Sequence, residues 1–98
     1  MSVFGHIGDG NLHLNLLPPV GQSLEALRAA AGERLTACVH DAAAELGGSF
    51  SAEHGVGVLK VRELERYEPA VALALMRTLK RALDPDGLMN PGKMLRAD

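Results

Sequence analysis

Two stretches of the sequence carry side chains that can do chemistry. The first, FGHIGDGNLHLN at residues 4–15, places His6 and His13 on either side of a glycine-rich bend. The second, SAEHGVG at residues 51–57, places Glu53 between a small residue and a histidine. Two neutral imidazoles and one carboxylate, with coordination positions left open, form the ligand set of catalytic zinc, manganese and non-haem iron sites. We therefore expect His6, His13 and Glu53 to bind one divalent metal ion.

A second histidine stands beside the proposed carboxylate ligand. His54 follows Glu53 directly, and neighbours on an extended segment point to opposite faces, so His54 need not bind the same metal. Imidazole titrates near neutrality, which suits a general base that takes a proton from a metal-bound substrate. A turn histidine held by backbone hydrogen bonds is the structural alternative, and the local pattern leaves both interpretations open.

The remaining polar residues of interest have structural interpretations. Asp9 and Asn11 are residue types that favour turns, so we expect them to shape the loop. Asn15 shares a strand face with His13 and either reaches the same pocket or lies at the surface. His40 lies off the apolar stripe of a predicted helix, which indicates a solvent-facing side chain.

Short strands must position the first stretch. Residues 3–7 are apolar enough for a strand that ends in an Asp-Gly turn. Residues 12–16 then alternate apolar and polar side chains, as a second strand does, until two prolines end it. We predict a third strand at residues 49–51.

A long helix is predicted between the two stretches, from the N-cap Ser23 to Gly47. Its apolar residues recur at spacings of three and four, at Leu24, Leu27, Ala31, Leu35, Cys38, Ala42 and Leu46. Cys38 is therefore expected to be a core residue. Two further helices are predicted, one at about residues 60–67 and one beginning near Pro69, where a missing N–H does no harm.

Composition indicates one small domain of the α+β class, with helices packed on one face of a small antiparallel sheet. The 98 residues are 47% hydrophobic and carry a formal charge of -2. Scattered basic residues argue against a nucleic-acid partner, and no apolar run reaches the ~18 residues of a membrane span. Because no signal segment opens the chain, we expect a cytoplasmic protein.

Three motifs in order, GHIGDGNLHLN, SAEHGVG and DPDGLMNPGKML, resemble the C-terminal end of FAD-linked oxidases of the vanillyl-alcohol oxidase superfamily. The most similar group contains the glycolate oxidase flavin subunit, D-lactate dehydrogenases and D-2-hydroxyglutarate dehydrogenase. The resemblance implies that residues 1–98 are the substrate and metal domain, and that an FAD-binding domain would precede Met1. It also implies that residues 84–98 form a tail that returns toward the flavin domain.

The resemblance assigns a role to each motif residue. His6, His13 and Glu53 match the family's metal ligands, and His54 matches the histidine that takes the substrate hydroxyl proton. Asn15 falls where the family has a polar contact to substrate. The implied substrate is a small D-2-hydroxy acid such as glycolate, D-lactate or D-2-hydroxyglutarate, which is oxidised to the 2-oxo acid.

The resemblance further implies FAD and a divalent metal (Zn, Mn or Fe) as cofactors, with Asn90 and Lys93 of the tail facing the flavin. An electron acceptor or partner subunit is also implied, and the 98-residue chain alone is expected to be inactive. An open strand edge would allow a homodimer.

Two other functions fit the same residues. A non-enzymatic dimerisation or ligand-sensing module would keep the glycine loops as structural turns and would leave the proposed ligands more than about 10 Å apart, too far for bonds of ~2 Å. A metal-dependent hydrolase would share the ligands without a flavin.

Overall fold

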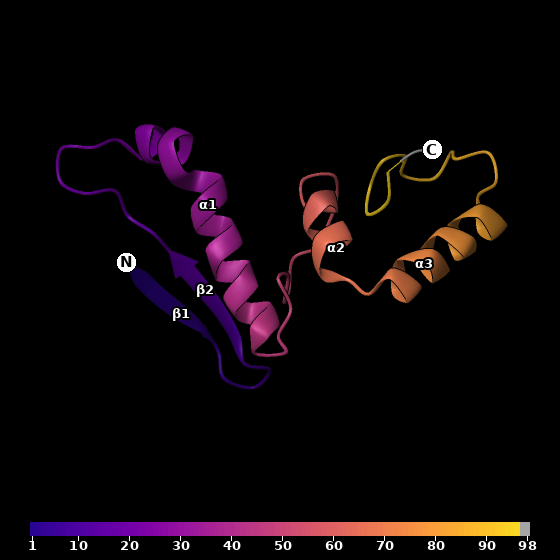
Figure 1. Cartoon of the computed structure of the whole chain (residues 1–98), viewed down its shortest axis with the longest axis horizontal. Coiled ribbons are helices and arrows are strands. Elements are labelled where there is room, and N and C mark those ends of the chain that lie inside the picture. The colour runs from indigo at the N-terminus through magenta and orange to yellow at the C-terminus, as the bar shows by residue number, and fades with distance from the viewer. Residues whose placement is uncertain (97–98) are drawn as a thin grey trace. The chain divides into compact units, whose positions relative to one another are not determined.

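The computed structural model describes residues 1–96, in which two strands and three helices form (Figure 1). They are β1 (Ser2–His6), β2 (Asn11–Asn15), α1 (Leu24–Glu45), α2 (Val61–Tyr67) and α3 (Ala70–Leu83). The predicted α+β class is confirmed. The chain divides into two compact units, residues 1–53 and 54–98. The last two residues of the predicted tail lie outside the described residues.

The N-terminal unit begins with a β-hairpin. Strands β1 and β2 pair antiparallel, with Phe4 opposite His13 and His6 opposite Asn11. Because side chains alternate between the two faces of a strand, and paired residues share a face, these four side chains lie on the same face of the hairpin. The hairpin thus collects the polar residues of the first sequence motif on one side.

Helix α1 follows and has the bounds that its caps predict. The Ser23 hydroxyl accepts a hydrogen bond from the Ala26 N–H at 3.1 Å, and Gly47, with φ of 74°, lies just beyond the helix end. A left-handed glycine at this position is a common helix stop. The predicted long helix is therefore confirmed.

The expectation that Cys38 belongs to the core is wrong, because its side chain is exposed and no residue of α1 is buried. A helix of 22 residues is roughly 33 Å long, whereas a five-residue strand spans only about 17 Å. Two strands of that length cannot cover the stripe that the periodicity marks.

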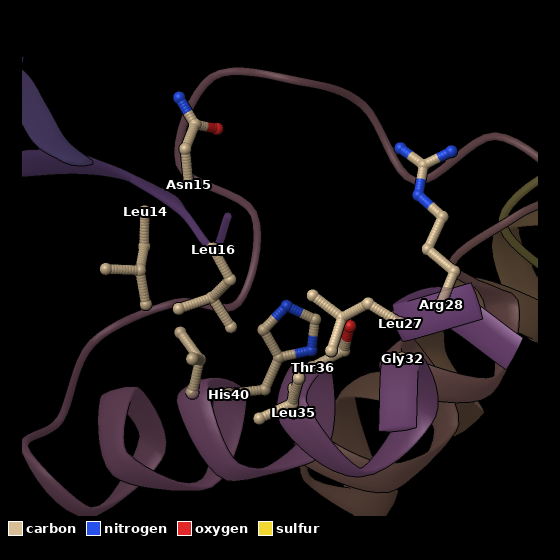
Figure 2. A pocket seen from close by; sticks show the side chains of 10 residues that line it. Leu14, Asn15, Leu16, Leu27, Arg28, Gly32, Leu35, Thr36 and His40 are labelled. Atoms are coloured by element: carbon tan, nitrogen blue, oxygen red, sulfur yellow. The ribbon is translucent and has the colours of Figure 1, made fainter. Parts of the chain in front are cut away.

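Strand β2 and helix α1 line a hollow of about 310 Å³ (Figure 2). Figure 2 shows Leu14 and Leu16 directed toward α1 and Asn15 directed away from it. His40 lines this hollow and is half-buried, with its ring 5.8 Å from the Phe50 ring. The expectation of a solvent-facing His40 is wrong, since the segment after α1 brings Phe50 against it.

The predicted third strand at residues 49–51 does not form, and the chain bends at Phe50. The Ser49 hydroxyl accepts from the Ser51 N–H at 3.3 Å and donates to the Ser51 carbonyl at 3.2 Å. Serine side chains that bind nearby backbone in this way offer it an alternative to a sheet ladder. These local hydrogen bonds replace the strand.

The C-terminal unit contains α2 and α3, which supply the buried apolar side chains of the described chain, Val61, Leu64 and Leu73. Both helices were predicted, and Pro69 is the N-cap of α3. Glu65 of α2 forms an ion pair with Arg96, with an N–O distance of 2.8 Å. None of the helices within residues 1–96 combines the length and the apolarity needed to cross a bilayer.

A buried carboxylate ends α3. Asp84 accepts the N–H groups of Leu88 and Met89 at 2.9 Å each, and it pairs with the Lys80 ammonium one helical turn before. The hydrogen bond from Lys80, together with the two N–H donors, holds the pKa of Asp84 below its ordinary value of 3.8, against the opposing effect of burial. The Gly87 N–H closes a turn at residues 84–87 on the Asp84 carbonyl at 3.1 Å, and the Asp84 side chain holds the two residues that follow.

The tail after this turn folds back on its own unit. The Met94 N–H donates to the Gly57 carbonyl at 2.8 Å, which joins the tail to the loop that follows His54. Met94 adopts a φ of 63°, a left-handed conformation that is uncommon for a residue with a long side chain. The tail is therefore ordered by specific contacts even though it has no regular structure.

Candidate metal centre

Three predicted ligands converge in the N-terminal unit. His6 ends β1, His13 lies in the middle of β2, and Glu53 comes from the segment after α1. One nitrogen or oxygen ligand atom from each lies within 4.8 Å of the others. The hairpin supplies two ligands and the chain beyond the helix supplies the third.

The Glu53 carboxylate joins the two imidazoles. Its Oε1 lies 2.8 Å from His13 Nε2, and its Oε2 lies 3.6 Å from His6 Nε2. The exposed fraction of the side chain rises from 27% for His13 to 36% for Glu53 and 68% for His6. The cluster is therefore covered at His13 and open to incoming molecules at His6.

Phe4 holds the covered end of the cluster. It is paired with His13 across the hairpin, and the two rings stack with centroids 4.9 Å apart and planes 6° from parallel. Offset stacking of flat rings restricts the rotation of both. The His13 imidazole is thus oriented before any metal binds.

These residues fit a divalent metal ion. In a tetrahedral site, bonds of about 2.0–2.2 Å from nitrogen and carboxylate oxygen to zinc hold two donors about 3.4 Å apart. The observed span of 4.8 Å exceeds that separation by more than an ångström, so the exposed side chains must rotate inward to bind an ion. Two imidazoles and a carboxylate also leave coordination positions for a substrate.

Sequence reasoning missed one residue of this cluster. Asn11 was expected only to shape the loop, yet its Nδ2 donates to Glu53 Oε2 at 2.8 Å, and Asn11 is buried. The signal was present in the strand period, because Asn11 and His13 are two residues apart and so share a face. What the pattern lacked was the position of Glu53, which comes from a distant segment.

Asn15 and His54 were predicted to contact the substrate. Asn15 is on the His13 face of β2, but it is paired with Ser2 at the end of the hairpin away from His6, and it is exposed. His54 is exposed as well and begins the C-terminal unit. Their proposed contacts remain predictions.

The tail residues predicted to face a flavin contact each other. Lys93 Nζ donates to Asn90 Oδ1 at 3.1 Å, and Asn90 adopts a φ of 48°, which asparagine tolerates better than most residues. Both side chains are exposed. The turn is well defined, and its flavin contact stays a prediction.

The sequence is similar to known oxidoreductases over most of its length. It is 47% identical to D-2-hydroxyglutarate dehydrogenase of Xanthomonas citri pv. viticola, over 93% of this chain and 19% of that protein. It is 46% identical to the mitochondrial D-2-hydroxyglutarate dehydrogenase of Bos taurus, over 94% and 16%. It is 40% identical to glycolate oxidase subunit GlcD of Bacillus subtilis, over 97% and 20%.

The chain therefore spans between 16% and 20% of the length of these relatives. No solved structure matched it. Residues 1–94 match the family described as FAD linked oxidases, C-terminal domain. That match includes the whole ligand cluster and the tail turn, and the chain belongs to the FAD-linked oxidase family, as its C-terminal domain.

Proposed function

We propose that this chain is the substrate- and metal-binding part of an FAD-dependent enzyme that oxidises a D-2-hydroxy acid to the 2-oxo acid. The observation that carries the proposal is the convergence of His6, His13 and Glu53 in a chain of this family. The relatives' names supply the substrate class, since 2-hydroxyglutarate and glycolate share a hydroxyl group beside a carboxylate. The preferred 2-hydroxy acid within that class is left to experiment.

Each residue of the cluster has a role in this proposal. His6, His13 and Glu53 would hold a divalent ion, and the ion would supply Lewis-acid chemistry that lowers the pKa of a substrate hydroxyl. The opening beside His6 admits the hydroxy acid, while the stacked His13 keeps the other side closed. The cluster thus binds the substrate through its oxygen atoms and orients the carbon that is oxidised.

Residues outside the cluster complete the reaction. His54 takes the hydroxyl proton on an imidazole nitrogen, and Asn15 makes a polar contact with the substrate. FAD would supply the acceptor for the hydride from C2, so that this carbon becomes a carbonyl. Asn90 and Lys93 form the turn that faces the flavin.

A titration of the 98-residue chain with Zn²⁺, and separately with Mn²⁺, followed by calorimetry, tests the metal assignment. One ion per chain is expected, and His6→Ala, His13→Ala and Glu53→Ala should each weaken it by roughly 100-fold or more, since even outer partners of a ligand cost 10–100-fold. The matched control is His40→Ala, a histidine of the same unit that lies outside the cluster. Equal affinity in all three ligand variants would contradict the proposal.

The proposal differs measurably from the two other functions. A non-enzymatic module was expected to hold the three ligands more than about 10 Å apart, beyond metal bonds of ~2 Å, and the span of 4.8 Å argues against it. A hydrolase would cleave esters with metal alone. We expect the Zn²⁺-loaded chain to show no ester hydrolysis above the Glu53→Ala background.

A further inference from the structure

Asn11 stands apart from the rest of the hairpin. Only 4% of its surface is exposed, and it is one of two buried polar residues among those the structure describes. Every residue of β1, by contrast, is exposed. A buried amide needs hydrogen-bond partners, because leaving its donors unsatisfied is costly. The partners of Asn11 therefore show what holds it in place.

The backbone and the side chain of Asn11 have separate partners. The backbone N–H donates to Asp9 Oδ1 at 3.2 Å, which is a local turn of the kind the sequence predicts. The side-chain Nδ2 donates to Glu53 Oε2 at 2.8 Å, across 42 positions of the chain. The turn accounts for the first bond only, so the side chain serves the distant carboxylate.

The direction of this bond follows from chemistry. An ionised carboxylate only accepts hydrogen bonds, so the amide must present its NH₂ group to Glu53. That group is not a metal ligand, and the bond therefore fixes the carboxylate without competing for the ion. The length of 2.8 Å is typical of a hydrogen bond to a charged acceptor.

Asn11 and His13 act on different oxygens of Glu53. Oε1 faces His13, and Oε2 faces Asn11. Two partners that hold the two oxygens define the plane of the carboxylate as well as its position. Groups that orient a ligating carboxylate in this way raise metal affinity, because less side-chain freedom is lost when the ion binds.

A glycine admits this arrangement. A Cβ placed on Gly5 would lie 1.8 Å from the Asn11 carbonyl oxygen, so any other residue would push the Asn11 backbone away. Gly5 lies opposite Leu12, the neighbour of Asn11 in β2. Because Gly5 has no side chain, the two strands come close enough for the Asn11 amide to reach the Glu53 carboxylate.

We propose that Asn11 is a positioning residue of the metal centre, which sets the orientation of the Glu53 carboxylate and thereby the affinity for the divalent ion. The inference rests on the proposed function, because it takes the cluster to be a metal site. It adds a residue that acts on the metal through Glu53, without touching the ion.

Zn²⁺ affinity of the 98-residue chain, measured by calorimetry, tests this. Asn11→Ala and Asn11→Leu, the second of which keeps the side-chain volume, should each weaken binding by roughly 10–100-fold. Ser2→Ala, on the same hairpin face, should leave the affinity unchanged. Circular dichroism of the metal-free variants should show unchanged helix content, as expected for chains that remain folded.

The decisive comparison is a double-mutant cycle with Glu53→Ala. If Asn11 acts through Glu53, adding Asn11→Ala to Glu53→Ala causes no further loss, because the carboxylate that it orients is gone. A further loss as large as that of Asn11→Ala alone would overturn the inference, since Asn11 would then act through the histidines or the fold.

The cycle also separates the two proposals. Saturable binding that depends on Glu53 but not on Asn11 overturns the positioning role alone. Failure of the unaltered chain to bind Zn²⁺ or Mn²⁺ overturns the metal assignment together with the positioning role. Loss in both single variants with no further loss in the double variant supports both.

Discussion

Glu53 and Asp84 are two carboxylates of the same chain that meet opposite kinds of partner. Asp84 is buried and faces an ammonium and two backbone N–H groups, none of which can bind a metal. Glu53 is more exposed and faces two imidazoles and one amide. Ammonium and backbone N–H groups can only donate hydrogen bonds to a carboxylate, whereas imidazole nitrogens could bind a metal ion together with it.

The sequence distance to the partners of a carboxylate helps to distinguish one that stabilises a local turn from one that belongs to a proposed binding site. Asp84 is held by residues within five positions of itself, so it stabilises a local turn. Glu53 is held by residues about forty positions away, so its position depends on the whole N-terminal unit. Substitutions that reach Glu53 should therefore change metal binding, and those that reach Asp84 should change stability.

Among substitutions outside the three proposed ligands, the largest effect is expected from Gly5→Ala. The added Cβ would overlap the Asn11 carbonyl at 1.8 Å, which displaces the hairpin backbone that carries both Asn11 and the histidines. We expect Zn²⁺ affinity to fall by roughly 100-fold, the upper end of what loss of a supporting contact causes. Calorimetric titration measures it.

Gly8→Ala is the matched control for that substitution. A Cβ at Gly8 meets no heavy atom within 4 Å, although Gly8 lies only three residues after Gly5, in the turn that follows β1. We expect its Zn²⁺ affinity to equal that of the unaltered chain. Retained affinity in Gly5→Ala would show that the close approach of the strands does not matter to the site.

An intermediate effect, on stability and not on metal, is expected from Asp84→Asn. The amide keeps the size of the side chain but removes the charge that the Lys80 ammonium and the N–H groups of Leu88 and Met89 share. We expect the thermal midpoint at neutral pH to fall by about 5 °C or more, with Zn²⁺ affinity unchanged. Asp86→Asn, an exposed position of the same turn, is the control and should leave the midpoint in place.

The smallest effect is expected in how the thermal midpoint depends on pH under acidic conditions. Because the pKa of Asp84 is lower in the folded chain than its ordinary value of 3.8, its stabilisation is complete above pH 3.8 and is lost as the pH falls through the folded pKa. The midpoint difference between the unaltered chain and Asp84→Asn should thus be constant above pH 3.8 and narrow below it. A difference that widens on acidification would contradict the pKa direction.

The features that could be predicted from the sequence are those that depend on neighbouring residues, such as helix ends and strand faces. Ser23 and Gly47 bound α1 because capping acts within one helical turn. The convergence of His6, His13 and Glu53 was predicted from residue types, because two imidazoles and one carboxylate are a common ligand set for a divalent metal ion. The period-two pattern of β2 gave the correct faces for the hairpin.

The predictions failed where a distant segment decides the outcome. Cys38 recurs at helical spacing with other apolar residues, yet such a residue is buried only where another element covers it, and no residue of α1 is buried. His40 is half-buried because Phe50 comes back against α1. Asn11 looked like a turn residue alone, because its type favours turns, and spacing cannot show that its side chain reaches the distant Glu53 carboxylate.

The bond from the Met94 N–H to the Gly57 carbonyl also imposes an order of events during synthesis. A chain grows at roughly 5–20 residues per second, so Gly57 is made seconds before its partner exists. Throughout that interval the loop after His54 lacks the contact that closes it. The catalytic histidine of the proposed reaction would therefore reach its final surroundings only after the tail turn has been translated.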